Sequence, residues 1–93
     1  MQFLIVATDG TDGDAPSRRS RARDDHRALI KKLKGAGNFK MGGHTLDANE
    51  QIIGSAVIVD FPSRAELDAY LKIEPYVVQC VWNEIKITRI NLG

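Results

Sequence analysis

The sequence has a single cysteine, Cys80, and only two histidines among its 93 residues. One thiol excludes an internal disulfide and every metal motif that needs several cysteines, which favours a reducing cytoplasm as the compartment. Two histidines without a cysteine cluster do not indicate a structural zinc site either. We therefore expect no metal and no cofactor. Cys80 has apolar neighbours and no basic flanking residue, so we interpret it as a packed thiol rather than a nucleophile.

Long hydrophobic runs and an excess of one charge are also missing. The apolar segment from Phe3 to Ala7 is far too short to span a membrane, and it lacks the basic start and the cleavage site of a secretion signal. We expect no membrane association, and we expect the chain to be used whole. Thirteen basic and twelve acidic residues leave a net charge of +1, which gives no global reason to expect a nucleic acid as partner.

Two local clusters of charge are interpreted as structural. The basic residues from 18 to 23 are followed at once by two aspartates, and the aromatic content is only 6%. A solvated, ion-paired helix face is therefore expected there rather than an RNA-binding patch. Asp9, Asp12 and Asp14 lack the spacing of a calcium loop, so we interpret them as loop-capping residues.

Hydrophobic patterning predicts one small domain, residues 1–93, with four strands and two helices. The expected strands span 2–7, 39–46, 52–61 and 82–90, and the expected helices span about 14–34 and 63–71. The third strand is expected to be interrupted at Gly54 and Ser55. Trp82, at the start of the last strand, is expected in the core or at a dimer interface.

Capping residues predict where the helices begin. Asp14 or Ser17 is suited to cap the first helix, because both side chains can accept a hydrogen bond from its first turn. Ser63, with Glu66 three residues later, forms a capping box in front of the second helix. The capping box is the most sharply defined boundary in the sequence.

Glycine and proline predict where the helices end. Gly35 and Gly37 follow a lysine-rich last turn and stop the first helix. Pro75 disfavours the helical conformation at Glu74, so the second helix ends there. A further short helical turn is expected before Cys80.

The element order β-α-β-β-α-β is typical of the ferredoxin-like α+β fold, an antiparallel sheet with both helices on one face. In the first strand Phe3 and Ile5 point one way, and Leu4 and Val6 point the other way. Both faces of the sheet are therefore apolar, although an uncovered face should be polar. The chain has no spare element for that face, so we expect a homodimer that packs sheet against sheet.

His26 interrupts the apolar stripe of the basic first helix. It shares one helix face with Ala22, Leu29 and Leu33. An imidazole on an inward face needs a polar partner, and the best distant candidate is Glu74, in the Glu-Pro-Tyr break after the second helix. The alternative is a structural histidine that bonds a backbone carbonyl, because spacing alone cannot show a reaction.

Several segments together resemble the YciI-like (YCII-related) proteins along the whole chain. They are Arg23-x-x-His26, Gly42-Gly43, the segment 54–59 and Glu74-Pro75-Tyr76-Val77. The most specific element is the helix histidine combined with the acidic-Pro-aromatic motif. The resemblance implies a dimeric α+β barrel with a cleft in which a histidine and an acidic residue form an acid–base dyad. Some relatives act in the breakdown of aromatic compounds, including a dehydrochlorinating enzyme, which implies lyase or isomerase chemistry on a small cyclic substrate.

The resemblance implies catalytic roles for His26 and Glu74. A neutral imidazole accepts the proton, and the carboxylate fixes its tautomer. The sequence departs from the family at Glu74, where Asp is usual, and at the residue after Gly43, where many members have proline. The residues expected to bind substrate are Arg23, Gly43, His44, Ser55 and Tyr76.

Alternatives remain open for three of these residues and for the function. Arg23 is also compatible with a solvated helix position, Tyr76 with simple packing, and His44 with an exposed strand position. The enzyme hypothesis is a small cytoplasmic lyase or isomerase that uses the dyad on a small cyclic substrate. The other hypothesis is a non-catalytic dimeric module that binds a small ligand or a partner. Substitution of His26 separates them.

Overall fold

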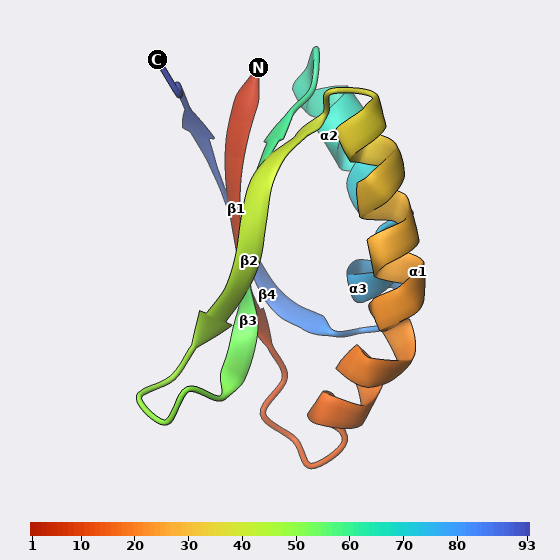
Figure 1. Ribbon diagram of the computed structural model, residues 1–93, viewed down its shortest axis with the longest axis vertical. Coiled ribbons are helices and arrows are strands. Elements are labelled where there is room, and N and C mark those ends of the chain that lie inside the picture. The colour runs from red at the N-terminus through yellow and green to blue at the C-terminus, as the bar shows by residue number, and fades with distance from the viewer.

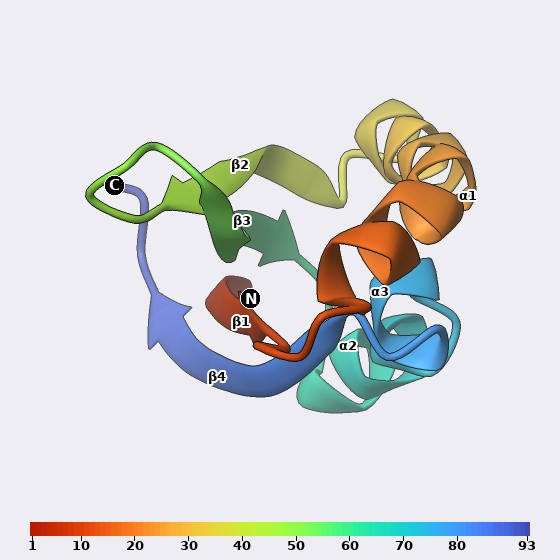
Figure 2. The ribbon, with the colours of Figure 1, turned by 90° about the horizontal axis from the view of Figure 1, so that it is seen from below.

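Four antiparallel strands form one sheet in the computed structural model, which describes residues 1–93, and their spatial order is β2-β3-β1-β4. The helices all lie on one side of this sheet (Figure 1). Figure 2 shows the sheet curving past the helix layer, with α1 near β2 and α3 near β4. The arrangement confirms the predicted ferredoxin-like α+β fold. The elements are β1 (Gln2–Asp9), α1 (Ala15–Gly35), β2 (Phe39–Leu46), β3 (Ile52–Asp60), α2 (Arg64–Leu71), α3 (Pro75–Val78) and β4 (Trp82–Ile90).

The end of α1 agrees with the prediction from the sequence, but the predicted capping at its start does not. Gly37 has φ 82°, and the N–H groups of Gly37 and Asn38 donate to the carbonyls of Lys34 and Leu33. This is the Schellman arrangement that a glycine after a helix favours. At the start, Asp14 is the N-cap residue, but it has helical backbone angles and its side chain accepts no capping hydrogen bond. The expected side-chain cap is therefore wrong, and Ser17 lies inside the helix.

α2 begins at the predicted residue, and Ser63 Oγ accepts the capping hydrogen bond from the Glu66 N–H at 3.2 Å, while the reciprocal bond from the Ser63 N–H to the Glu66 side chain is not formed. Glu74 then begins α3 with extended backbone angles, and its Oε1 accepts the Tyr76 N–H at 3.1 Å. Pro75 occupies the first helical position, where its missing N–H costs nothing. Local capping thus fixes the direction of the Glu74 side chain.

Cys80 requires a correction. It follows α3 with φ 59°, and its thiol is exposed. The chain reverses at this left-handed residue before β4 begins, and the Cys80 carbonyl accepts a hydrogen bond from Arg18 Nε at 3.2 Å. Val78, one of the apolar neighbours of Cys80 in sequence, is exposed as well, so the chain offers no packed surroundings there and the prediction of a packed thiol is wrong.

Two strands differ from the expected ranges. β1 continues to Asp9, which pairs with Trp82 of β4 after a register shift. β3 runs through Gly54 and Ser55 without interruption. A Cβ atom on Gly54 would lie 2.0 Å from the carbonyl oxygen of Ala7. This glycine therefore allows close approach of β1 rather than a break in β3.

The core lies between the sheet and the helices, and Trp82 belongs to it. On the opposite face, Leu4 and Val6 of β1 lie beside Ile58 and Ala56 of β3. The outward positions of β4 are polar and exposed, at Glu84, Lys86 and Thr88, which pair with β1. The expectation of an apolar open face therefore holds for β1 and β3, and not for β4. No helix has the length and hydropathy needed to cross a membrane.

Candidate active site

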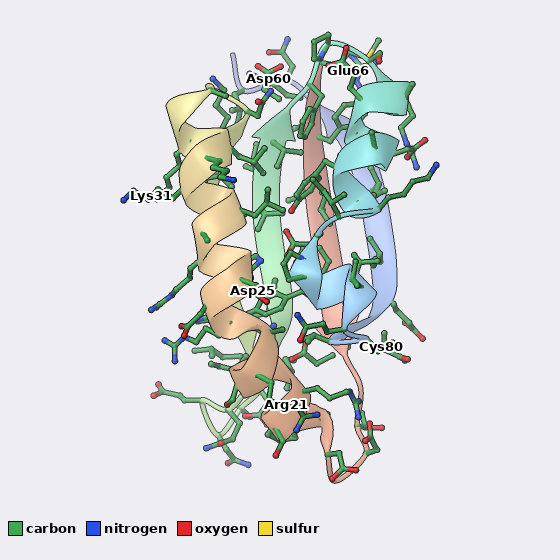
Figure 3. The ribbon with its side chains drawn as sticks, turned by 90° about the vertical axis from the view of Figure 1, so that its right-hand side faces the viewer. Arg21, Asp25, Lys31, Asp60, Glu66 and Cys80 are labelled. Atoms are coloured by element: carbon green, nitrogen blue, oxygen red, sulfur yellow. The ribbon has the colours of Figure 1, made fainter.

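His26 of α1 meets Glu74 at the start of α3. Figure 3 looks onto the helix layer and shows α1 running beside α2 and α3 in front of the sheet. His26 Nδ1 lies 2.5 Å from Glu74 Oε1. The histidine side chain is 15% exposed and the glutamate side chain is fully buried. The contact expected from the sequence is therefore present, while its chemical role stays a prediction.

The Glu74 carboxylate is surrounded by donors. Tyr70 O–H donates to Oε2 at 2.5 Å, and the Tyr76 N–H donates to Oε1 at 3.1 Å. Burial, together with the charge and the hydrogen bond of Glu74, raises the pKa of Tyr70 far above its ordinary value, so the hydroxyl keeps its proton. Every partner of Glu74 except His26 is thus a fixed donor. A carboxylate held in this way accepts the Nδ1–H of His26 as well.

The ring of His26 is held from a second direction. It stacks on Tyr76 with ring centroids 3.9 Å apart and planes inclined by 8°. Nε2 of His26 forms no hydrogen bond with the protein. Every buried side-chain nitrogen or oxygen of a non-exposed residue does form one, so Nε2 is not buried. Nε2 is therefore accessible, at the wall of the cavity that His26 lines. With the hydrogen on Nδ1, this exposed nitrogen carries the lone pair of a base.

A cavity of about 430 Å³ opens in front of His26, between α1 and the strands β2 and β3. Its volume falls within the range of small-molecule sites. One wall carries four basic side chains of α1 and no acidic residue: Arg23, Arg27, Lys31 and Lys34. We call these four residues the rim. Arg23 thus lies at the cavity, where it was expected, and the other three were not singled out by the sequence analysis.

Beside it lies a second cavity of about 500 Å³, which shares Arg23, His44 and Tyr76 with the first. Its wall includes Asp9 and Arg19, which the sequence analysis placed in a loop and on a solvated helix face. Both are buried. Arg19 donates twice to Asp9, at 2.6 and 3.0 Å. The solvated interpretation is therefore wrong for Arg19, because β1 extends far enough to place a carboxylate under α1.

Arg19 and Trp82 both reach Ser55 on β3. Arg19 Nη2 donates to Ser55 Oγ at 2.9 Å, and Trp82 Nε1 donates to the same oxygen at 3.1 Å. Two donors leave Ser55 with its own hydrogen to offer, and Ser55 lines the first cavity. Arg19 also lies over the Tyr76 ring, 4.7 Å from its centroid. Burial of the guanidinium opposes its charge, but the hydrogen bond and the charge of Asp9, together with Tyr76, outweigh burial, and the pKa of Arg19 is raised.

Tyr76 is buried and lines both cavities, so it packs against the dyad and also forms part of the wall. Burial raises the pKa of its hydroxyl, although the charge of Arg19 opposes this. Gly43 lines the first cavity, yet a Cβ atom there would meet nothing within 4 Å. At Gly42, by contrast, a Cβ atom would lie 2.7 Å from Val57 Cγ1. Gly42 rather than Gly43 thus keeps the wall of β2 close to its neighbours.

His44 is an exposed residue of β2, as one alternative expected, and it also lines both cavities. Its Nδ1 is 3.3 Å from Arg19 Nη1. Burial lowers the pKa of His44 below its ordinary value, and the positive charges of Arg19, Arg23 and Arg27 lower it further. No group of three or more histidine, cysteine, aspartate or glutamate side chains is placed to hold a metal ion.

Comparison with known families and structures gives a consistent assignment. The family model described as YCII-related domain matches residues 1–91. A dehydrochlorinase of 5-chloro-2-hydroxyhydroquinone from Burkholderia phenoliruptrix, solved with 2,5-dihydroxybenzoquinone, is 24% identical and has a TM-score of 0.85, with 100% of this chain and 96% of that chain covered. No curated protein matches the chain significantly.

Two further solved structures share the fold at lower similarity. A dimeric ferredoxin-like protein of unknown function from Jannaschia sp. has 15% identity, a TM-score of 0.56 and 98% coverage of both chains. A hypothetical protein from Pyrococcus horikoshii has 12% identity, a TM-score of 0.52, and coverage of 99% of this chain and 94% of that chain. These similarities establish the fold.

Proposed function

The chain belongs to the YCII-related domain family, and from this premise we propose that it is an acid–base enzyme, a lyase or isomerase, acting on a small cyclic substrate. The observation that carries the proposal is the orientation of His26. Its Nδ1 is held by the buried Glu74 at 2.5 Å, while Nε2 has no protein partner at the cavity wall. A positioned base with a fixed tautomer is what proton abstraction requires.

In the proposed reaction, Nε2 of His26 takes a proton from a C–H or O–H group of the substrate. The electron pair of the broken bond moves into the ring system of the substrate. The imidazolium that forms is stabilised by Glu74, which remains ionised beside it. The return of this proton to another atom gives an isomer, and loss of a leaving anion gives an elimination product.

The rim favours an anionic substrate. Arg23, Arg27, Lys31 and Lys34 line the cavity, and no acidic residue lines it. Such a one-sided distribution of charge concentrates anions and stabilises an enolate or a departing halide. Phenolates and hydroxyquinone anions have the size and the charge that this cavity accepts.

The similarity to the dehydrochlorinase supports this substrate class. That enzyme acts on a chlorinated hydroxyhydroquinone and was solved with a dihydroxybenzoquinone. Both molecules are six-membered rings with acidic hydroxyl groups. Dehydrochlorination removes a proton and a chloride ion, which matches a base beside a cationic wall.

We also propose a homodimer formed through the open sheet face. Leu4 and Val6 of β1 and Ile58 of β3 offer an apolar centre there, and Val6 is 38% exposed in the single chain. A specific interface of this kind buries about 1,200–2,000 Å² in total. Sedimentation at micromolar concentration should give a dimer, and a stable monomer would contradict this part of the proposal. A cytoplasmic location, expected from the single cysteine, stays a prediction.

Turnover of 5-chloro-2-hydroxyhydroquinone, followed as chloride release under nitrogen, tests the enzyme proposal. We expect His26→Ala to lower the rate by about 10²–10⁴-fold, as for loss of a general base. We also expect Glu74→Gln to lower the rate, because a neutral amide stabilises the imidazolium less than a carboxylate, while its matched control Glu66→Gln, which changes an exposed glutamate on α2, should leave the rate unchanged. If His26→Ala stays folded and turns the substrate over at an unchanged rate, the enzyme proposal is wrong.

Binding of 2,5-dihydroxybenzoquinone provides a second readout. Trp82 is the sole tryptophan, and its ring lies 5.8 Å from the ring of Tyr76 at the cavity wall. Its fluorescence should be quenched as the quinone binds. Binding without any turnover of the chlorinated compound would favour the non-catalytic ligand-binding module.

A further inference from the structure

His44 and His26 line the same cavity from different layers of the fold. His26 comes from α1 and His44 comes from β2. The strand register pairs His44 with Ser55, whose side chain points towards the helices. His44 therefore faces the cavity from the sheet side. Its position has no part in the His26–Glu74 dyad.

The hydrogen-bond partners assign the tautomer of His44. Arg19 Nη1 lies 3.3 Å from His44 Nδ1. A guanidinium only donates, so Nδ1 of His44 has to accept. Arg19 cannot turn away from this contact easily, because Asp9 and Ser55 hold its other nitrogens. A neutral His44 therefore carries its hydrogen on Nε2.

The neutral form is also the one that the surroundings favour. Burial and the charges of Arg19, Arg23 and Arg27 all lower the pKa of His44. No carboxylate is hydrogen-bonded to His44 to stabilise an imidazolium. His44 is an exposed residue that lines the cavity, and its Nε2 has no protein hydrogen-bond partner, so this N–H is free to bind a ligand there.

The two imidazoles thus have opposite tautomers. His26 donates from Nδ1 to a carboxylate and offers the lone pair of Nε2. His44 accepts at Nδ1 from a guanidinium and offers the hydrogen of Nε2. Glu74 sets the first tautomer and Arg19 sets the second. Arg19 is a positioning residue in this arrangement, because it acts through His44.

We propose that His44 is a second catalytic residue, a neutral donor whose Nε2–H binds the substrate oxygen on which negative charge develops when His26 removes a proton. This inference rests on the proposed function. In the step, the substrate reacts as its keto tautomer: the C–H bond beside the carbonyl breaks, and its proton bonds to His26 Nε2. The released electron pair forms a C=C bond, and the carbonyl π pair moves onto oxygen as an enolate. His44 donates to that oxygen and keeps its own proton.

A neutral donor suits this position better than a cation would. The rim already supplies positive charge, and an imidazolium at His44 would add a charge next to Arg19 and Arg23. A preorganised N–H aimed at a developing oxyanion stabilises the transition state by a direct hydrogen bond. The device needs no reagent beyond the substrate, because the step is a proton transfer with balanced electrons.

The tautomers are measurable without turnover. In protein labelled with ¹⁵N-histidine, long-range ¹H–¹⁵N correlation at neutral pH should show two ring patterns. We expect Nδ1–H for His26 and Nε2–H for His44. Added 2,5-dihydroxybenzoquinone should shift the Nε2–H resonance of His44. An Nδ1–H tautomer or an imidazolium at His44 would overturn the inference, as would a quinone that shifts other cavity residues and leaves His44 unmoved.

Activity separates this inference from the proposed function. His44→Phe should lower kcat for the chlorinated hydroxyhydroquinone by about 10²-fold, the cost of one oxyanion donor. His44→Gln, which restores an N–H donor, should recover a substantial part of that loss. If His26→Ala abolishes turnover while His44→Phe leaves kcat unchanged, the inference fails and the proposed function stands. If His26→Ala has no effect, the proposed function fails, and the tautomer measurement still decides the orientation of His44.

Discussion

Two groups of polar and charged residues near the cavities, which we call the floor and the rim, use their charges in different ways. We define the floor as two buried hydrogen-bonded pairs, Asp9 with Arg19 in the wall of the second cavity and Tyr70 with Glu74 behind His26. None of the four rim residues forms a salt bridge. Buried charges in ion pairs fix the positions of the side chains around them. Exposed charges without a partner create a positive electrostatic potential at the cavity. We therefore expect the floor to position the two imidazoles and the rim to attract an anionic ligand.

The energetic consequences of the two arrangements differ as well. A buried pair stabilises little against an apolar replacement, but loss of one partner leaves an uncompensated charge away from water. An exposed charge is well solvated and screened by salt within roughly 8–10 Å. Damage to the floor should therefore appear in the free energy of unfolding. Damage to the rim should appear in binding and in its dependence on salt.

The largest effect is expected for Asp9→Asn. This change leaves the Arg19 guanidinium buried without its carboxylate, which should lower the free energy of unfolding by about 3–5 kcal/mol. Urea denaturation followed by Trp82 fluorescence measures it. The matched control is Asp12→Asn. Asp12 accepts two hydrogen bonds from Arg18, the residue that precedes Arg19, and this pair is more exposed to solvent. Equal losses in the two variants would contradict the distinction between floor and surface.

The contrast between Arg18 and Arg19 also shows what the sequence can and cannot predict. The two arginines are adjacent, and the charge pattern predicts the same solvated helix face for both. Arg19 is buried only because β1 extends to Asp9, which is a tertiary fact about strand pairing. Helical spacing by itself cannot supply the position of a distant carboxylate.

The features predicted correctly depended on local signals or on an unusual residue type. Ser63 with Glu66 defines a helix start within four residues, and glycine at 37 defines a helix end. The His26–Glu74 contact followed from an inward-facing polar residue that needed a partner. The environment of Cys80 was predicted wrongly. Its backbone is left-handed, and a left-handed conformation is usually predicted only at glycine or asparagine.

The next largest effect concerns Tyr70 at alkaline pH. The pKa of Tyr70 is raised in the folded state, so above about pH 10 the unfolded chain loses this proton and the folded chain keeps it. The folded state then binds more protons, and its stability falls as pH rises by about 1.4 kcal/mol per pH unit for this group. Below pH 10 the contribution is fully present.

Tyr70→Phe provides the test of this slope. The variant should be less stable at neutral pH by about 1–3 kcal/mol, because Glu74 Oε2 loses its donor. Above pH 10 its stability should fall less steeply with pH than that of the parent, since only Tyr76 still contributes a raised tyrosine pKa. Urea midpoints at a series of pH values measure both terms. Identical slopes would mean that Tyr70 is not held as the floor requires.

A smaller effect is expected at the rim. Arg23→Gln and Arg27→Gln should each weaken binding of 2,5-dihydroxybenzoquinone about 2–5-fold, and the loss should shrink as salt is raised. Arg21→Gln is the matched control, because Arg21 is exposed on the same helix and lies outside both cavities. Trp82 fluorescence titration gives the dissociation constants. An equal loss with Arg21→Gln would indicate a general charge effect instead of a rim.

The smallest effect is expected for the exposed pair of Arg18 with Asp12. The hydrogen bond and the charge of Arg18 lower the pKa of Asp12 from 3.8 to about 2, and desolvation opposes this shift. The folded pKa lies below the unfolded one, so the contribution of this pair is present above about pH 4 and is lost as the pH falls towards 2. NMR titration of the Asp12 carboxyl carbon should show the low pKa in the parent and a value closer to 3.8 in Arg18→Gln. The urea midpoint at neutral pH should change little, because the Asp12 side chain is 53% exposed and solvent screens the pair. A large loss of stability in Arg18→Gln would mean that this pair contributes as much as the buried pairs of the floor. Burial would then not explain the difference between the two kinds of pair.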